Sequence, residues 1–193
     1  MRTSVCVYSA SSTKVPEQYN VAARSLGRIL AQSSIRLING AGRMGLMAEC
    51  ANACLDAGGK VTGVIPHFMV EQGWHHNGLT ELIETDTMHD RKETMAKMAE
   101  GIIALPGGIG TLEELMEIIT WKQLSLFLHP IIILNTGGYY DPLLEMLQRT
   151  LDEQFMGSIY AHLWLVASTP EEAVQLLLST PDWAADIRKY AAL

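Results

Sequence analysis

Short β-rich apolar runs alternate with longer segments of helical periodicity along most of the chain. The β-rich runs lie at 4–9, 35–39, 60–65, 101–105, 130–134 and 163–167, and helical patterns lie at about 17–33, 44–57, 90–99, 111–124, 141–153 and 170–178. Strands that alternate with helices of this length form βαβ units, in which the strands are parallel. The runs at 60–65 and 101–105 are nearly continuous in apolar residues, as is typical of strands covered on both faces. We therefore predict an α/β fold: a Rossmann-like, doubly wound parallel sheet flanked by helices.

The length of 193 residues predicts a single domain, since a domain takes roughly 100–200 residues. The longest apolar stretches are far shorter than the ~20 residues of a membrane-spanning helix, so no membrane association is expected. The N-terminus has the alternation of a strand and not the pattern of a signal peptide, which predicts a cytoplasmic protein. The formal net charge of −7 argues against a nucleic-acid-binding protein, which normally carries a basic stripe.

The cysteines and histidines give no sign of a disulfide framework or a metal site. Cys6, Cys50 and Cys54 are too few for a framework, and no ligand at metal spacing accompanies the pair at 50 and 54. Free cysteine behaves as a small core hydrophobe, so buried thiols are expected. His75 and His76 are adjacent, and two neighbouring histidines without further ligands seldom bind zinc. The sequence therefore predicts neither a metal nor a disulfide.

Ligands of doubly wound folds bind at the carboxyl ends of the strands, which directs attention to the loops there. The first such loop contains Ser11, and the second reads "NGAGRMG", from Asn39 to Gly45. The second loop resembles a dinucleotide fingerprint, but it follows the second strand, and the next strand carries no acidic residue at its tip. An NAD site is therefore not expected. Two interpretations stay open: a turn that contacts a nucleotide through Asn39 and Gly40, or a purely structural turn.

The segment "MHDRKETMAKM" places two cations near the start of a predicted helix, with Asp90 as the expected N-cap. Arg91 and Lys92 are poorly placed there, because the N-terminus of a helix is itself positive. This placement suggests that an anion is bound nearby; the alternative is two solvated charges. Arg91 is the better candidate, since a guanidinium grips a phosphate or carboxylate through two bonds. Met88, just before the pair, is a candidate for packing against a base.

The segment "LPGGIGTLEEL" joins an apolar strand to a helix through three glycines. Thr111 and Glu114 have the spacing of a capping box, with Thr111 as N-cap. A capping box does not require glycines, whereas an anion that binds the first amides of a helix does benefit from them. The lysine of an NTPase loop is absent. We therefore predict a monophosphate site formed by Gly107, Gly108, Ile109, Gly110 and Thr111.

The helix that follows carries three glutamates with different orientations. Glu113 is rotated about 100° from Glu114, so the two do not form an opposed carboxylate pair. Glu114 is therefore expected to act with a cation, for which Arg91 is the candidate. Glu113 and Glu117 share a face, which favours a solvated stripe.

These two segments together resemble one family. Arg91 to Met95 reads R-K-x-x-M, and P-G-G-x-G-T-x-x-E runs from Pro106 to Glu114. Both patterns, at this separation, resemble the Lonely Guy family of cytokinin riboside 5′-monophosphate phosphoribohydrolases, formerly labelled possible lysine decarboxylases. "GLM" at 45–47 and "GGYYDPLLEML" at 137–147 also match, and the resemblance extends over essentially the whole chain.

The resemblance implies a hydrolase that cleaves the N-glycosidic bond of AMP or of a cytokinin riboside 5′-monophosphate, giving a free base and ribose 5-phosphate. It implies that Arg91 and Glu114 are the catalytic pair and that Gly108 to Thr111 hold the phosphate. It also implies that the substrate site is lined by Lys92, Leu112, Glu113 and Thr120. A homodimer with the site near its interface is expected, with no cofactor and no metal.

The sequence departs from the family in three loops. Ala41 stands where many members have glycine, Gly73 stands where many have a substrate-binding glutamate, and the loop containing Ser11 lacks an expected glycine. These departures affect the expected choice of substrate more than the catalytic pair.

Two other functions are weighed against hydrolysis. One is a carrier of a phosphorylated ligand, of the molybdenum-cofactor-carrier type; the presence of both Arg91 and Glu114 favours the enzyme, since a carrier needs no glutamate beside a ribose. The other is pyridoxal-phosphate-dependent lysine decarboxylation, which requires a Schiff-base lysine and an acidic partner for the pyridine nitrogen. No lysine here stands in such a context.

Overall fold

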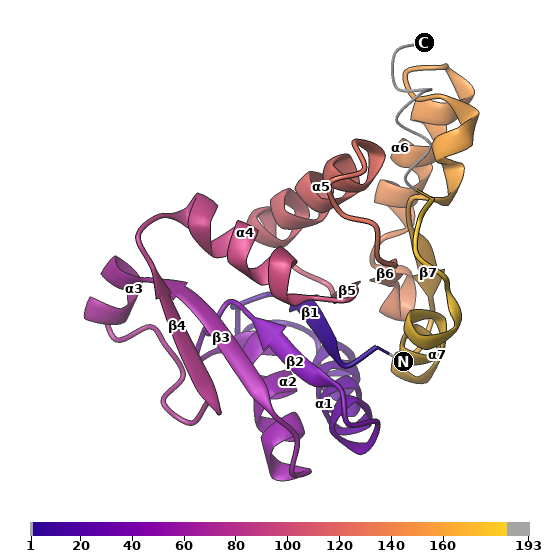
Figure 1. Ribbon diagram of the computed structural model, residues 1–193. Helices are drawn as coiled ribbons and strands as arrows, with labels where there is room; N and C mark the ends of the chain where they lie inside the picture. The colour runs from indigo at the N-terminus through magenta and orange to yellow at the C-terminus, as the bar shows by residue number, and fades with distance from the viewer. Residues whose placement is uncertain (1, 185–193) are drawn as a thin grey trace.

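A computed structural model describes residues 2–184 and shows one parallel sheet in that part of the chain (Figure 1). The strand order is β4-β3-β2-β1-β5-β6-β7, and every neighbouring pair is parallel. The strands are β1 (Ser4–Tyr8), β2 (Arg36–Asn39), β3 (Val61–Pro66), β4 (Glu81–Thr85), β5 (Ile102–Ala104), β6 (Ile131–Leu134) and β7 (Leu165–Ala167). The predicted α/β class with a doubly wound parallel sheet is confirmed.

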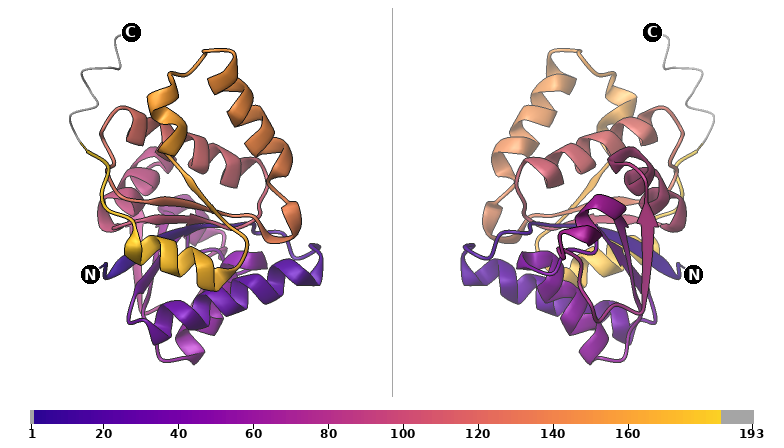
Figure 2. Two further views of the ribbon diagram at one scale, coloured as in Figure 1. Left: turned by 90° about the vertical axis from the view of Figure 1, so that its right-hand side faces the viewer. Right: turned by 90° about the vertical axis from the view of Figure 1, so that its left-hand side faces the viewer.

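The helices connect the strands in turn. They are α1 (Glu17–Gln32), α2 (Gly45–Asp56), α3 (His67–Glu71), α4 (Met88–Met98), α5 (Ile109–Gln123), α6 (Asp141–Asp152) and α7 (Pro170–Ser179), with short 3₁₀ turns η1 (Thr136–Gly138) and η2 (Ser158–His162). Helices α1, α2 and α7 cover one face of the sheet, and α4 and α5 cover the other (Figures 1 and 2).

The sheet separates two hydrophobic cores because successive side chains of a strand point to opposite faces. In β1, Val5 and Val7 join the core under α1, α2 and α7, whereas Cys6 and Tyr8 join the core under α4 and α5. The same alternation holds in β6. Strand β3 is buried at every position, as its apolar sequence predicts.

The strand order reverses between β1 and β5. From β1 the chain builds outward to β4 and then returns to place β5 on the other side of β1. The loops that leave these two strands diverge at their carboxyl ends, which is where a doubly wound sheet forms its ligand crevice. The two loops are hydrogen-bonded to each other where they leave the strands. The Leu105 amide donates to the Tyr8 carbonyl at 2.9 Å, and the Ala10 amide donates to the Pro106 carbonyl at 3.3 Å.

One strand and one short helix were not predicted. Strand β4 and helix α3 both lie between the third and fourth predicted strands, where the sequence pattern predicts a loop that leads to the next helix. Strand β4 is an edge strand that pairs only with β3, and its residues are exposed or half-buried. Because β4 is not buried on both faces, its sequence "ELIET" lacks the continuous apolar run that marks the inner strands.

Two helix starts differ from the prediction. Helix α4 begins at Met88 with Thr87 as N-cap, so Asp90 is not the cap; it is the third helical residue of a capping box with Thr87. Helix α5 begins at Ile109 with Gly108 as N-cap and no side-chain cap bond. Thr111 is therefore inside the first turn.

The cysteines are buried free thiols, as predicted. Burial raises the pKa of Cys54 to about 11, and it raises the pKa of Cys50 further, so both stay protonated. Among residues 2–184, no three His, Cys, Asp or Glu side chains are grouped as they would be to hold a metal ion.

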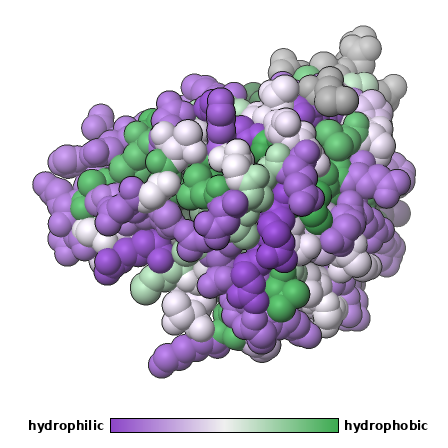
Figure 3. All heavy atoms as spheres, turned by 90° about the horizontal axis from the view of Figure 1, so that it is seen from below, coloured by the Kyte–Doolittle hydropathy of each residue, from purple (hydrophilic) through white to green (hydrophobic). Residues whose placement is uncertain are grey.

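No helix within residues 2–184 is long and apolar enough to cross a membrane. On the face drawn in Figure 3, hydrophilic residues separate the hydrophobic ones into patches.

Candidate functional site

Arg91 and Glu114 meet between α4 and α5, at the carboxyl-end side of the sheet. The guanidinium Nη1 lies 3.4 Å from the carboxylate Oε1, and the two side chains are only 8% and 10% exposed. The structure thus brings together the two residues that were predicted as a pair from separate segments. Twenty-three positions of sequence separate them, and the packing of α4 beside α5 removes that separation.

Arg91 is oriented by three elements. Its Nε donates to the Val64 carbonyl of β3 at 3.1 Å, and its Nη1 lies 4.0 Å from the Met88 sulfur on its own helix. Its Nη2 packs against Gly40 in the loop after β2, where an added Cβ would lie only 1.7 Å away. The guanidinium can therefore occupy this position only because residue 40 has no side chain.

Replacing Gly40 with alanine is expected to lower catalytic activity by about 100-fold, because displacement of a catalytic group by 1 Å costs on that order. Steady-state kinetics checks this. Gly42→Ala is the matched control in the same loop, since its Cβ would meet only the flexible Met47 side chain, at 3.0 Å from the sulfur. Equal losses of activity in the two variants would show that the conformation of the whole loop determines activity, and not the space that Gly40 leaves for the Arg91 guanidinium.

Glu114 lies in surroundings that oppose its charge. Burial raises the pKa of its carboxyl above the ordinary value, and the nearby Arg91 charge offsets only part of that effect. Cys6 and Tyr8 lie close enough to feel both charges, and burial raises the pKa of each, so the floor of the site is uncharged. A carboxylate in such a low-dielectric position interacts strongly with a cationic centre that forms beside it.

A second ion-pair group ties α4 to α5. Lys92 Nζ lies 2.5 Å from Glu113 Oε1 and 3.1 Å from Glu117 Oε1. Burial alone would lower the pKa of Lys92, but its hydrogen bonds to the two carboxylates raise the pKa above the ordinary value, so the amine stays charged. The interpretation of Lys92 as a solvated charge is therefore wrong, whereas Glu113 stays exposed and Glu117 partly exposed, with both carboxylates paired to Lys92. The partners come from a different helix, which spacing along one helix does not reveal.

The predicted phosphate loop has open amides and occupied carbonyls. In the part of the chain that the structure describes, the five successive amides of Gly107 to Thr111 donate no hydrogen bond. The first turn of any helix leaves such donors free, and they attract anions. A Cβ at Gly108 or at Gly110 would meet no atom of residues 2–184 within 4 Å, so the described fold does not require glycine there and the space is left for a ligand.

Thr111 does not act as the predicted cap. It is buried, and a Cβ at Gly107 would lie 2.1 Å from its hydroxyl oxygen, so its side chain fills the space inside the turn of the loop. Glu114 likewise does not reach back to cap the helix; it faces Arg91. The sequence pattern T-x-x-E is present, but its capping function is not.

Comparison with known proteins places this site in a family. A protein-family model described as possible lysine decarboxylase matches residues 44–177, which include both motifs. A cytokinin riboside 5′-monophosphate phosphoribohydrolase of Rhodococcoides fascians is 43% identical over 154 residues, which cover 79% of this chain and 78% of the relative. The chain belongs to the Lonely Guy family.

Further matches agree in sequence and in fold. A cytokinin riboside 5′-monophosphate phosphoribohydrolase of Arabidopsis thaliana is 38% identical over 173 residues, covering 90% of this chain and 81% of the relative. Among solved structures, the molybdenum cofactor carrier protein of Chlamydomonas reinhardtii superposes with a TM-score of 0.69 over 93% of this chain and 100% of its own. At 23% identity, that likeness shows a shared fold alone.

Not every residue predicted to bind substrate lies at the Arg91–Glu114 pair, and Ser11 and Ile109 are among those predicted. Ile109 is exposed beside the open amides, Leu112 is half-buried, and Ser11 is exposed in the loop after β1. Thr120 lies on the exposed side of α5, where its hydroxyl donates to the Met116 carbonyl at 2.8 Å. The structure of one chain therefore does not bring Thr120 to the site. Its predicted role stays a prediction.

The loop after β2 is held by Asn39. Its Oδ1 accepts the Ala41 amide at 2.9 Å, and Asn39 is buried. Ala41 has φ of +59°, in the left-handed region that glycine occupies more easily, and this is the position where family members often have glycine. Asn39 and Ala41 thus fix the turn that brings Gly40 against Arg91, which favours a positioning role for this loop.

The other family departure lies in the segment after α3. Gly73 has φ of +68°, and in the described part of the chain no atom lies within 4 Å of the position its Cβ would take. Glu71, two residues earlier, ends α3 and lies 3.5 Å from the His67 ring. Glu71 is therefore engaged locally.

Two tyrosines that contact the phosphate loop were not predicted as site residues. Tyr139 donates its hydroxyl to the Gly107 carbonyl, and Tyr140 donates to the Leu105 carbonyl, each at 2.7 Å. The motif "GGYYDP" matches the family but does not by itself predict a role for either tyrosine. The contact joins segments more than thirty residues apart, which no local pattern reveals.

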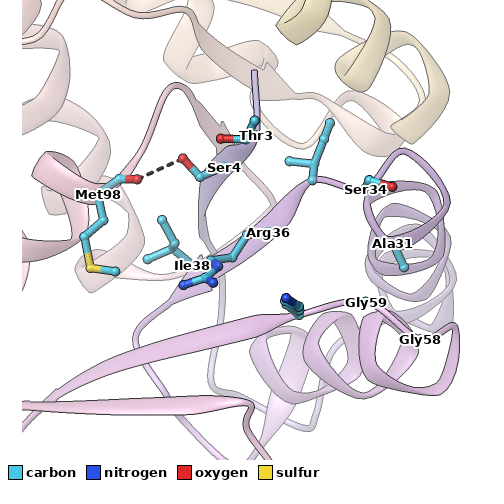
Figure 4. Close-up of a pocket in the computed structure, with 11 residues that line it drawn as sticks. Thr3, Ser4, Ala31, Ser34, Arg36, Ile38, Gly58, Gly59 and Met98 are labelled. Carbon is cyan, nitrogen blue, oxygen red and sulfur yellow. Dashed lines mark hydrogen bonds between the residues drawn. The ribbon is translucent and has the colours of Figure 1, made fainter. Parts of the chain in front are cut away.

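A cavity of about 610 Å³ lies at the amino-terminal ends of the strands, across the sheet from their carboxyl ends (Figure 4). Helices α1, α2 and α4 all end near it, and helix C-termini carry partial negative charge, which disfavours a phosphate. No predicted site residue lines it; the lining includes Ser4, Ser34, Arg36, Gly58, Lys60 and Met98. The hollow is distinct from the site at the carboxyl ends.

Proposed function

We propose that this protein hydrolyses the N-glycosidic bond of nucleoside 5′-monophosphates, releasing a free base and ribose 5-phosphate. The observation that carries the proposal is the buried Arg91–Glu114 pair one helical turn from five open amides. A turn of α-helix rises about 5.4 Å, a span comparable to the one ribose that separates the 5′-phosphate from the glycosidic bond. The names of the Rhodococcoides fascians and Arabidopsis thaliana relatives state this activity.

The chemistry follows from the environment of Glu114. As the bond from C1′ to the base nitrogen breaks, its electron pair leaves with the base, which takes up a proton, and positive charge develops on the ribose. The Glu114 carboxylate stabilises that charge, and water adds to C1′. The carboxylate is more effective in a low-dielectric site, because its own solvation has already been removed. Arg91, engaged with Val64 and Glu114, holds the carboxylate in position.

The phosphate supplies binding energy at a distance from the reacting bond. Open amides of the loop bind the phosphate equally in the ground state and in the transition state, so this contact raises kcat/KM through the affinity for the nucleotide. We further propose AMP and cytokinin riboside 5′-monophosphates as substrates, with Met88, which is 40% exposed beside Arg91, packing against the base.

We also propose that the protein is a homodimer. Large apolar side chains are exposed at the end of α5 and along α6 and the segment that follows: Leu124, Leu126, Met146 and Phe155. Light scattering on purified protein measures the mass directly. A monomer at micromolar concentration would contradict this part of the proposal.

The function is tested by incubating the protein with a panel of AMP, isopentenyl-AMP, GMP and CMP and detecting the free base by chromatography. We expect adenosine, which lacks the phosphate, to be hydrolysed at least about 100-fold less efficiently than AMP, since loss of remote binding reduces transition-state stabilisation. Ribose 5-phosphate should appear in equal amount to the base. Absence of base from every monophosphate, together with tight binding of a phosphorylated ligand, would favour a carrier.

A further inference from the structure

Three successive carbonyls, where β5 leads into the phosphate loop, each accept a hydrogen bond from a different partner. The Leu105 carbonyl accepts the Tyr140 hydroxyl, and the Gly107 carbonyl accepts the Tyr139 hydroxyl, both at 2.7 Å. Between them, the Pro106 carbonyl accepts the Ala10 amide at 3.3 Å. The loop therefore has its acceptors occupied while its donors stay open.

Holding a carbonyl also fixes an amide. The peptide unit is planar and trans, so the carbonyl of one residue and the N–H of the next point in opposite directions. The bond from Tyr139 to Gly107 therefore directs the Gly108 N–H away from Tyr139. The bond from Tyr140 has no such effect, because Leu105 is followed by Pro106, which has no N–H. The two neighbouring tyrosines thus differ in what they control.

Tyr139 is itself held rigidly. Its ring packs edge-on against Tyr140 and against Tyr19 of α1, with centroid separations of 5.0 and 5.7 Å. The chain reaches this position through Gly137 and Gly138, which both have positive φ. The hydroxyl is therefore presented to the loop from a fixed support, although the residue is 40% exposed.

We propose that Tyr139 is a positioning residue that sets the affinity of the loop for phosphate by aiming the Gly108 amide. This inference rests on the proposed phosphate site and adds to it a residue that touches neither the substrate nor the reacting bond. Phosphate contacts that are equal in ground state and transition state alter KM and leave kcat unchanged. Tyr139 therefore controls KM.

The test compares Tyr139→Phe with Tyr140→Phe, which removes the same hydroxyl from the adjacent ring. For Tyr139→Phe we expect the dissociation constants of inorganic phosphate and ribose 5-phosphate, and KM for AMP, to rise about three- to tenfold, the effect of losing one neutral hydrogen bond. We expect kcat to change less than about twofold, since the contact serves ground state and transition state alike. Tyr140→Phe leaves a buried carbonyl unpaired, so it should lower Tm with little effect on phosphate affinity.

The outcomes separate the two proposals. If ribose 5-phosphate binds wild type and Tyr139→Phe equally well, the positioning role is wrong. If Tyr139→Phe and Tyr140→Phe weaken phosphate binding to the same extent, the effect is general loss of structure and the assignment also fails. If wild type releases no base but Tyr139→Phe still weakens phosphate binding selectively, the positioning role stands and the hydrolase proposal falls.

Discussion

Glu114→Gln is expected to lower kcat for base release by about 10³-fold while Tm at neutral pH stays the same or rises. The loss follows because an amide cannot stabilise the positive charge that develops on the ribose, and one preorganised electrostatic contact is worth roughly 10²–10³-fold. The gain or neutrality in stability follows because the native carboxylate is buried against its preference for water. Gln keeps the size of the side chain and an oxygen that can accept from Arg91.

The pH dependence gives the sign of the stability effect. The folded pKa of Glu114 is raised above its unfolded value of 4.5. The folded state therefore holds the proton more tightly, and stability from this group is present below pH 4.5 and is lost as the pH rises through the folded pKa. Consequently the Tm of Glu114→Gln should exceed that of wild type increasingly between pH 5 and 8 and should equal it at lower pH, as measured by thermal unfolding.

Glu93→Gln is the matched control, because Glu93 is exposed on α4 and, within residues 2–184, forms an ion pair only with Lys97. It should change neither kcat nor the pH profile of Tm. A Glu114→Gln variant that keeps more than a tenth of the wild-type kcat would contradict the catalytic role. A fall of several degrees in its Tm at pH 7 would contradict the electrostatic account.

Arg91→Met is expected to abolish activity and to destabilise the fold by roughly 3–5 kcal/mol at pH 7, because the buried Glu114 carboxylate then loses the charge that offsets part of its burial cost. In Glu114→Gln, by contrast, the Arg91 guanidinium keeps the Val64 carbonyl and the Gln amide oxygen as acceptors. The double variant Arg91→Met with Glu114→Gln should recover much of that stability, because neither charge of the buried pair remains. Chemical denaturation of the wild type, both single variants and the double variant measures the coupling directly.

This penalty should also depend on pH. Loss of the Arg91 charge raises the folded pKa of Glu114 further, so destabilisation grows as the pH rises above 4.5 and fades below it. Lys97→Met, which removes an exposed cation from the same helix, should have little effect at any pH. Equal destabilisation by Arg91→Met at pH 5 and pH 8, with no recovery in the double variant, would show that packing of the Arg91 side chain is the larger contribution.

The sheet and the central pair are accessible from sequence because their signals are local. Alternating apolar runs and helical periods predict the parallel sheet, and the position of Glu114 one helical turn inside the glycine loop marks it as the carboxylate of the site. The glycines before Thr111 predict open amides. Each of these inferences uses residues within one segment, and the sheet topology then brings the segments together.

What was missed depends on contacts between segments. Lys92 finds its carboxylates on α5, and Tyr139 finds the Gly107 carbonyl from the loop after β6. Strand β4 lacks an apolar run because it lies at an edge. The capping prediction for Thr111 failed for another reason: the T-x-x-E pattern fits a cap, but the helix starts two residues earlier, and Thr111 fills the turn of the loop.

The open amides of Gly107 to Thr111 belong to the main chain, and this affects how the loop would behave under mutagenesis. Alanine at Gly108 or Gly110 keeps its N–H and meets no atom within 4 Å. When stability is measured, alanine substitution would therefore be tolerated at Gly108 and Gly110, within the segment proposed to hold the phosphate. Only changes that delete an N–H, such as proline, or that rotate a peptide plane would reveal it. Phosphate binding at this loop therefore depends on the path of the backbone, and the identity of each residue matters only through its effect on that path.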